Sequence, residues 1–213
     1  MIVFDVYADI TCPWCYIGER RLHSALAQRP DIEVELNWRP FQLNPYANPA
    51  GEDWDAFVAQ KFGARAKQMF DHVTQIGAAD GIEFVFDRIA SSPNTVDGHR
   101  LILFAGRHGK QWEMADRLYR AYFTEGRNLN DHDQLVELAA SVGLDADAVR
   151  EYLSGDEGRD EVHQSQQQAY RLGISGVPFF VVNGRYGISG AQPVDVFLEV
   201  LDTVQQEAAT QET

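Results

Sequence analysis

The chain has 213 residues, of which 45% are hydrophobic and 11% aromatic, so it can bury a substantial core in one or two compact domains. Its formal net charge is −14 at pH 7. This acidity argues against nucleic acid and anionic membrane surfaces as partners, because both bind clustered Lys and Arg. The first basic residue is Arg20, so the N-terminus lacks the basic start of a secretory signal. We therefore expect a cytoplasmic protein with neither nucleic-acid nor membrane partners.

The first 40 residues predict a strand, a helix and a second strand. Residues 2–9 alternate apolar and other side chains with a period of two, and residues 32–39 show the same alternation. The segment 14–28 between them carries apolar residues at helical spacing and ends at Arg29-Pro30; these residues are Ile17, Leu22, Ala25 and Leu26. The opening is therefore β-α-β.

From about residue 51 to residue 173, helical periodicity replaces the strand pattern. It begins with apolar residues three or four apart between Trp54 and Ile76, and further helices are expected at about 94–108, 112–125, 131–142, 145–154 and 156–172. Asp131 and Asp145 are predicted N-caps, and four glycines are predicted stops: Gly109, Gly126, Gly143 and Gly173. The segment 82–89 is ambiguous and is interpreted as a short extended link.

The last part of the chain returns to strands. Asn183-Gly184 stands between two apolar runs, which is the turn chemistry of a tight hairpin, and a final helix is expected from about Pro193. This order predicts an α/β thioredoxin-like fold with a large inserted all-helical domain. We assign residues 1–50 and 174–213 to a discontinuous thioredoxin-like domain and residues 51–173 to the helical insertion.

Both cysteines of the chain lie in the stretch "DITCPWCYIG", with Pro13 and Trp14 between Cys12 and Cys15. A structural zinc site needs four ligands and a catalytic one needs three, and the six histidines show no pair at the spacing of a zinc finger. We therefore expect no metal. A redox pair needs two neighbouring thiols, one of them activated, and the positive end of a helix dipole favours a thiolate at Cys12. The spacing alone leaves a redox pair and two buried core thiols both open.

Three blocks of the sequence resemble the DsbA-family oxidoreductases: "DITCPWCYIGERRL", "SPNTVDGHRL" and "GISGVPFFVVNGRYGISGAQ". The resemblance runs from about Ile2 to Leu201. It is closest to the FrnE-like branch, which is related to 2-hydroxychromene-2-carboxylate isomerases and kappa-class glutathione transferases. It implies a thioredoxin fold, Cys12 as nucleophile, Cys15 as its redox partner, and a cis Val177-Pro178 bond that faces the cysteines.

The resemblance also implies a substrate-binding role for the residues around the pair, namely Pro13, Trp14, Val177 and Pro178. Trp14 departs from the histidine that periplasmic relatives have between their cysteines, so we expect a weaker oxidant. Protein or small-molecule thiols and disulfides are the expected partners. No bound cofactor is expected, but glutathione is a candidate reductant or co-substrate. The sequence leaves a homodimer open.

Two other functions compete with thiol-disulfide exchange. A glutathione-dependent isomerase or transferase is the first, although such relatives typically have serine at the position of Cys12. A chaperone or partner-binding module is the second. It would use aromatic residues whose helical spacing fits a core better: Phe57, Phe62, Phe70, Trp112, Tyr122 and Phe123.

Three polar residues near these motifs are left outside the expected catalytic set. Asn94 is interpreted as a helix cap and His99 as a helix-surface or core residue. Asp9 could accept protons near Cys12, but it is interpreted as a solvated acid at the end of a strand.

Overall fold

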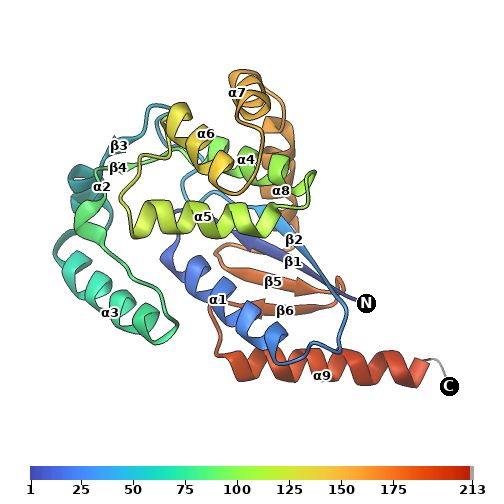
Figure 1. Cartoon of the computed structure of the whole chain (residues 1–213). Helices are drawn as coiled ribbons and strands as arrows, with labels where there is room; N and C mark the ends of the chain where they lie inside the picture. Colours follow the sequence, from blue (N-terminus) through green and yellow to red (C-terminus); the bar gives the residue numbers. More distant parts are fainter. Residues whose placement is uncertain (212–213) are drawn as a thin grey trace.

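The computed structural model describes residues 1–211 and has a mixed four-stranded sheet at its centre, in the order β2-β1-β5-β6 (Figure 1). β1 (Ile2–Ala8) is parallel to β2 (Val34–Pro40). On its other side β1 is antiparallel to β5 (Phe179–Val182), which pairs with β6 (Tyr186–Ser189). The two ends of the chain therefore build one sheet, as the alternating patterns predict.

The last two strands form the predicted hairpin. Asn183 and Gly184 have φ angles of 50° and 66°, the left-handed backbone that a tight two-residue turn requires. The Asn183 side chain also accepts a hydrogen bond from the Val3 backbone N–H at 2.8 Å, which ties the turn to β1. Helices α1 (Pro13–Ala27) and α9 (Val194–Gln211) pack side by side against the sheet (Figure 1).

Seven helices lie between β2 and β5: α2 (Trp54–Lys61), α3 (Ala66–Ala79), α4 (Val96–Gly106), α5 (Gln111–Phe123), α6 (His132–Ser141), α7 (Ala146–Ser154) and α8 (Arg159–Arg171). Asp131 and Asp145 cap α6 and α7 by accepting backbone N–H hydrogen bonds, as predicted. The four predicted stop glycines all have positive φ angles.

Two local features in this part of the chain differ from the sequence patterns. β3 (Glu52–Asp53) pairs with β4 (Ser91–Ser92), and strands of two residues are too short to show a period. The ambiguous segment 82–89 is an irregular link that contains one 3₁₀ turn, Phe86–Arg88. Phe84 in this link is buried and stacks on Phe86, which explains why the segment is apolar without being a strand.

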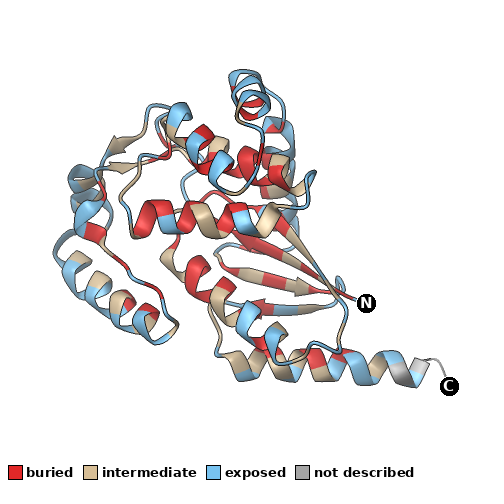
Figure 2. Ribbon diagram, viewed as in Figure 1, coloured by how far each residue is buried: buried red, intermediate tan, exposed pale blue. Residues whose placement is uncertain are grey.

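A continuous hydrophobic core joins the sheet to the helices around it. Buried residues run along β1, α4 and α5, whereas the residues of α3 are mostly half-buried or exposed (Figure 2). Helices α4 and α8 contact β2, and α5 contacts α1. The division of the chain at residues 50/51 and 173/174 stays a proposal, because one core contains buried residues from both sides of it.

Candidate active site

The cysteine pair lies where β1 leads into α1. Cys12 is the N-cap of α1 and Pro13 occupies the first helical turn, where its missing N–H leaves no hydrogen bond unmade. The Cys12 N–H donates to the Asp9 carbonyl at 3.1 Å, which fixes the turn between strand and helix. Both cysteines are free thiols; Cys12 is 4% exposed and Cys15 is 1% exposed. The strand-to-helix junction expected for the pair is therefore present.

The structure brings Val177 and Pro178 to the cysteine pair from the far end of the sequence. The Cys12 Sγ lies 3.7 Å from the Val177 carbonyl oxygen, to which it donates a hydrogen bond across 165 positions of the chain. The Val177-Pro178 bond is cis, as predicted. Gly18 permits the close approach of α1, because a Cβ atom there would lie 3.0 Å from Pro178 Cγ.

An apolar cavity of about 240 Å³ opens on the outer side of Cys12. Trp14 lines it, and its ring centroid is 6.1 Å from that of His72 on α3, so Trp14 contacts both the cavity and the inserted helices. Lys61 is positioned over two aromatic rings of the wall, Phe57 and Phe62. The wall also includes Pro13, Trp54, Met69, Phe70, Val73, Phe86, Tyr122 and Phe123.

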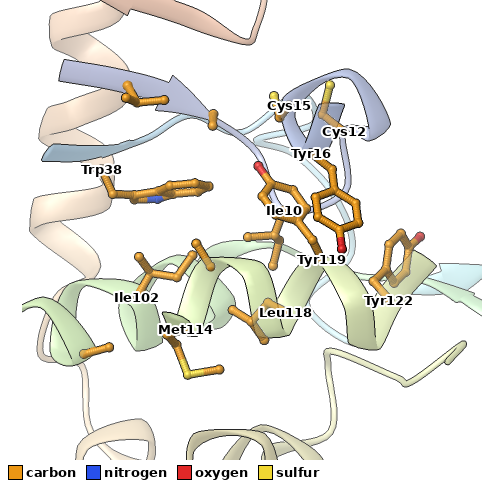
Figure 3. Close-up of a cluster of buried hydrophobic side chains, with 14 of the residues drawn as sticks. Ile10, Cys12, Cys15, Tyr16, Trp38, Ile102, Met114, Leu118, Tyr119 and Tyr122 are labelled. Atoms are coloured by element: carbon orange, nitrogen blue, oxygen red, sulfur yellow. The ribbon is translucent and has the colours of Figure 1, made fainter. Parts of the chain in front are cut away.

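Cys15 faces the interior of the protein. Burial raises the pKa of its thiol well above the usual value, and contact with Cys12 and the charge of Asp9 raise it further, while the Asp9 backbone lowers it. Figure 3 shows Tyr119 extending from α5 toward the two cysteines, in the packed layer that also contains Ile10 and Tyr16. Cys15 is therefore a neutral thiol at neutral pH in an almost fully buried position.

Asp9, His99 and Trp38 form a buried polar group next to this interior side. One Asp9 carboxylate oxygen, Oδ2, accepts the Leu43 N–H at 2.8 Å, and the other, Oδ1, lies 3.4 Å from His99 Nε2. His99 Nδ1 accepts the Trp38 indole N–H at 3.3 Å. Because an indole nitrogen can only donate, His99 Nδ1 carries no proton, and the proton of the neutral imidazole is on Nε2, facing Asp9.

The interpretation of Asp9 as a solvated acid is wrong, because only 1% of the residue is exposed. The chain after β2 covers it: Phe41 N–H donates to the Ala8 carbonyl and Leu43 N–H to the Asp9 carboxylate. His99 is fully buried in α4. Asn94 accepts the Val96 N–H at 3.1 Å, but it stands one residue before Thr95, the N-cap of α4, so it is not the cap residue itself.

Within residues 1–211, no group of three or more His, Cys, Asp or Glu side chains is placed to hold a metal ion. No helix in that same range is long and apolar enough to cross a membrane.

A four-stranded mixed sheet with a C-x-x-C pair at the start of its first helix and a cis-proline beside it defines a thioredoxin-fold protein. The model of the DSBA-like thioredoxin domain matches residues 3–202, and the chain belongs to that family. A probable DsbA oxidoreductase from Streptomyces coelicolor is 36% identical, with a TM-score of 0.90 over 97% of this chain and 91% of that chain.

Two further relatives have names that state two different activities. Cytosolic disulfide reductase DsbM from Pseudomonas aeruginosa is 25% identical, with a TM-score of 0.67 over 96% of this chain and 98% of that chain. A structure of the same reductase with GSH also matches. The 2-hydroxychromene-2-carboxylate isomerase of Sphingobium xenophagum is 25% identical over 84% of this chain and 88% of its own length. The resemblance to the DsbA-family oxidoreductases of the FrnE-like branch, with its relation to the 2-hydroxychromene-2-carboxylate isomerases, is therefore confirmed.

Proposed function

We propose that the protein is a thiol-disulfide oxidoreductase that uses Cys12 and Cys15 as its dithiol/disulfide pair. The observation that carries this proposal is the contrast between the two sulfurs. Cys12 lies at the start of α1 with its Sγ against the Val177 carbonyl, and Cys15 lies behind it in the interior. A helix start with free N–H groups stabilises a thiolate, so Cys12 is the attacking sulfur.

The reaction proceeds in two exchanges. The Cys12 thiolate attacks a substrate disulfide R–S–S–R′, one substrate sulfur leaves and is protonated to R′–SH, and Cys12 is joined to the other as a mixed disulfide. The Cys15 thiol then loses its proton and attacks Cys12 Sγ, which releases R–SH and leaves a Cys12–Cys15 disulfide. Two glutathione thiols return the pair to the reduced form and become oxidised glutathione. The Val177 backbone is positioned to pair with an extended substrate in the manner of a β-strand.

We assign Pro13, Trp14, Val177 and Pro178 to substrate binding because they lie around the cysteine pair. We also propose that the reaction takes place in the cytoplasm. The related DsbM is a cytosolic disulfide reductase with a structure that contains GSH, which supports both the cytoplasmic location and the use of glutathione. Protein or small-molecule thiols and disulfides are therefore the proposed substrates, with glutathione as the reductant.

Single-cysteine variants test this function. Cys12→Ser should abolish reduction of dithiodipyridine, because a serine hydroxyl is not appreciably ionised at neutral pH and forms no mixed disulfide. Cys15→Ser should release one thiopyridone per protein and then stop until glutathione is added. Mass spectrometry of the stalled protein should show one adduct on Cys12. Retained reductase activity in Cys12→Ser would exclude the proposal.

The apolar cavity favours one second candidate, a glutathione-dependent isomerase of small aromatic compounds. Its wall includes eight aromatic residues and it reaches Cys12, as a site for a flat apolar substrate requires. If isomerisation were the activity, Cys12→Ser would keep turnover of 2-hydroxychromene-2-carboxylate with glutathione and show no redox defect. Loss of both activities in Cys12→Ser would leave disulfide exchange as the better account of the cysteine pair.

A further inference from the structure

The apolar cavity beside Cys12 has the size of one aromatic ring with its substituents. Its volume is about 240 Å³, and an apolar cavity of about 150 Å³ holds a benzene molecule. Eight of the residues that line it are aromatic, so a ring inside it has flat faces and ring edges to pack against. The cavity is too small for a stretch of polypeptide with several side chains. Its dimensions therefore favour one arm of a small disulfide.

The opening of the cavity lies between α2, α3 and the chain that follows β2. Four of the residues that line the cavity are exposed to solvent: Leu43, Asn44, Lys61 and Met69. Cys12 also lines the cavity, although it is 4% exposed. A small molecule that enters between the four exposed residues is therefore brought to the cysteine that attacks.

Lys61 is the only Lys or Arg among the described residues of the cavity wall. Its Nζ lies 5.1 Å from the centroid of the Phe57 ring and 5.8 Å from that of Phe62, which holds the ammonium group at the aromatic wall. The other two lysines of the chain, Lys67 and Lys110, each pair with a carboxylate three or four residues further on, at 2.6 Å and 3.3 Å. Within residues 1–211, Lys61 forms no such pair.

Asp9 is the acidic residue of the cavity wall, and it does not neutralise Lys61. It is 1% exposed, and its Oδ2 accepts the Leu43 N–H at 2.8 Å. The chain as a whole has a formal charge of −14, so most of its surface repels anions. An acid in the cavity gains the Lys61 ammonium as its counter-ion. The attraction is stronger there than in open water, because the aromatic side chains exclude part of the solvent.

We propose that the cavity binds one arm of a small disulfide, an aromatic ring that carries a carboxylate, and that Lys61 selects this arm by pairing with the carboxylate. This inference rests on the proposed function and narrows its substrate class to anionic aromatic disulfides. The Cys12 thiolate attacks the sulfur on the ring, a Cys12–S bond forms, and the S–S bond of the substrate breaks. The other arm leaves as a thiolate and takes a proton from solvent. Cys15 then displaces the aromatic thiol from Cys12.

Two aromatic disulfides of similar size separate charge from shape: para-dithiodibenzoate and its neutral diamide, para-dithiodibenzamide. The measurement is the rate constant with which each disulfide oxidises the reduced protein, obtained by acid quench and mass spectrometry. Each rate constant is divided by that for free glutathione, which removes the difference in intrinsic reactivity. The relative rate of the dibenzoate should exceed that of the amide by at least about fivefold, because charge-assisted hydrogen bonds are roughly twice as strong as neutral ones.

Variants of two lysines assign this preference. Lys61→Met keeps the apolar stem over the aromatic rings and should lower the ratio of acid to amide to about one, whereas Lys61→Arg should keep most of it. In the wild type, high salt should reduce the ratio. Lys67→Met is the matched control, because Lys67 belongs to α3 but does not line this cavity, and its ratio should equal that of the wild type. Dithiodipropionate, which has the acids without a ring, should show no gain over glutathione.

Equal relative rates for the dibenzoate and the amide in the wild type would overturn the inference. An acid preference that survives in Lys61→Met would also overturn it, because the carboxylate would then be recognised elsewhere. A gain for dithiodipropionate as large as that for the dibenzoate would show that the ring is not recognised, which contradicts the assigned substrate class. Failure of the proposed function has a different signature: none of the disulfides would then convert the two thiols into a Cys12–Cys15 disulfide.

Discussion

The loop between β1 and α1 has an apolar cavity on one side and buried polar side chains on the other. The cavity side is lined by Trp14 and by aromatic residues of α2 and α3, and it is where Cys12 is reached. The polar side contains His99 and Tyr119, packed among β2, α4 and α5, and Asp9 lies between the two sides because it also lines the cavity. Two thiols one helical turn apart therefore differ in what they can do. The cavity side suits substrate contact, and the other side keeps the second thiol buried and raises its pKa.

The polar side should tolerate added volume least. In Gly98→Ala, an ideal Cβ would lie 2.2 Å from Ile10 Cδ1, and Ile10 is fully buried beside Asp9. We expect the free energy of unfolding to fall by about 2 kcal/mol, because overpacking outweighs the better helix propensity of alanine. Urea denaturation measures this free energy of unfolding. Gly176→Ala, where nothing lies within 4 Å of the added atom, should change it by less than about 0.5 kcal/mol. Equal losses of stability in Gly98→Ala and Gly176→Ala would show that the two positions are packed equally tightly.

The cavity side should instead respond in substrate affinity. Trp14→Ala removes an aromatic wall next to Cys12, so the KM for dithiodipyridine should rise about tenfold, while that for oxidised glutathione should change less. Steady-state kinetics with both disulfides measures the difference. The control is His72→Ala, which removes the neighbour of Trp14 on α3 but does not line the cavity. If both substrates lose affinity equally, the indole serves packing rather than recognition.

Glu19 gives the polar side a measurable effect of pH on stability. Its pKa is raised above the ordinary 4.5, so the folded protein holds this proton more tightly than the unfolded chain. Unfolding releases the proton, and the free energy of unfolding falls as pH rises from 4.5 toward the raised folded value. Glu19→Gln removes that fall. Between about pH 5 and about pH 8 its stability relative to wild type should increase by about 1 kcal/mol or more.

An exposed glutamate provides the comparison for that titration. Glu113→Gln, on the surface of α5, should follow the wild-type stability at both pH values. Parallel pH curves for wild type and Glu19→Gln would show that the buried carboxyl group makes no such contribution.

The smallest expected effect is a difference in stability between the Tyr→Phe variants of two tyrosines of α5. Tyr119→Phe removes a hydroxyl that has no partner among residues 1–211, so stability should stay constant or rise by up to about 1 kcal/mol. Tyr122→Phe removes a hydroxyl that donates to the Ser91 carbonyl at 3.4 Å, so it should lose about 0.5–1 kcal/mol. Thermal denaturation of the two variants shows whether Tyr119→Phe is the more stable one. A destabilised Tyr119→Phe would show that its hydroxyl makes a favourable interaction.

Much of the fold could be predicted from the sequence because the signals for its strands, turn and helix starts are local. A period of two specifies β1 and β2, the pair Asn183-Gly184 specifies a turn, and Asp131 and Asp145 specify helix starts. The position of the cysteine pair follows from the same local patterns. The cis bond at Pro178 came from the family resemblance rather than from any periodicity.

The polar side of the site could not be predicted in this way. Asp9 follows a strand, where an acid is ordinarily solvated, and only the returning backbone of Phe41 and Leu43 buries it. Glu19 lies four residues after Cys15 and three before Leu22, so helical spacing places it on the buried face of α1, but its acidic side chain gives no sign of burial. The burial of Asp9 depends on contacts between segments that are far apart in the sequence. A single sequence carries no local signal for those contacts.

The strand order also determines when the site is completed during synthesis. β5 pairs with β1, and it is the stretch just before β5 that supplies the Val177 carbonyl beside Cys12. A ribosome makes both thiols within the first two elements but makes the carbonyl partner of Cys12 only after eight α-helices have been translated. The emerging chain therefore carries its cysteines in an unfinished setting for most of its synthesis, and the thiols gain their mature surroundings only when the two ends of the polypeptide meet.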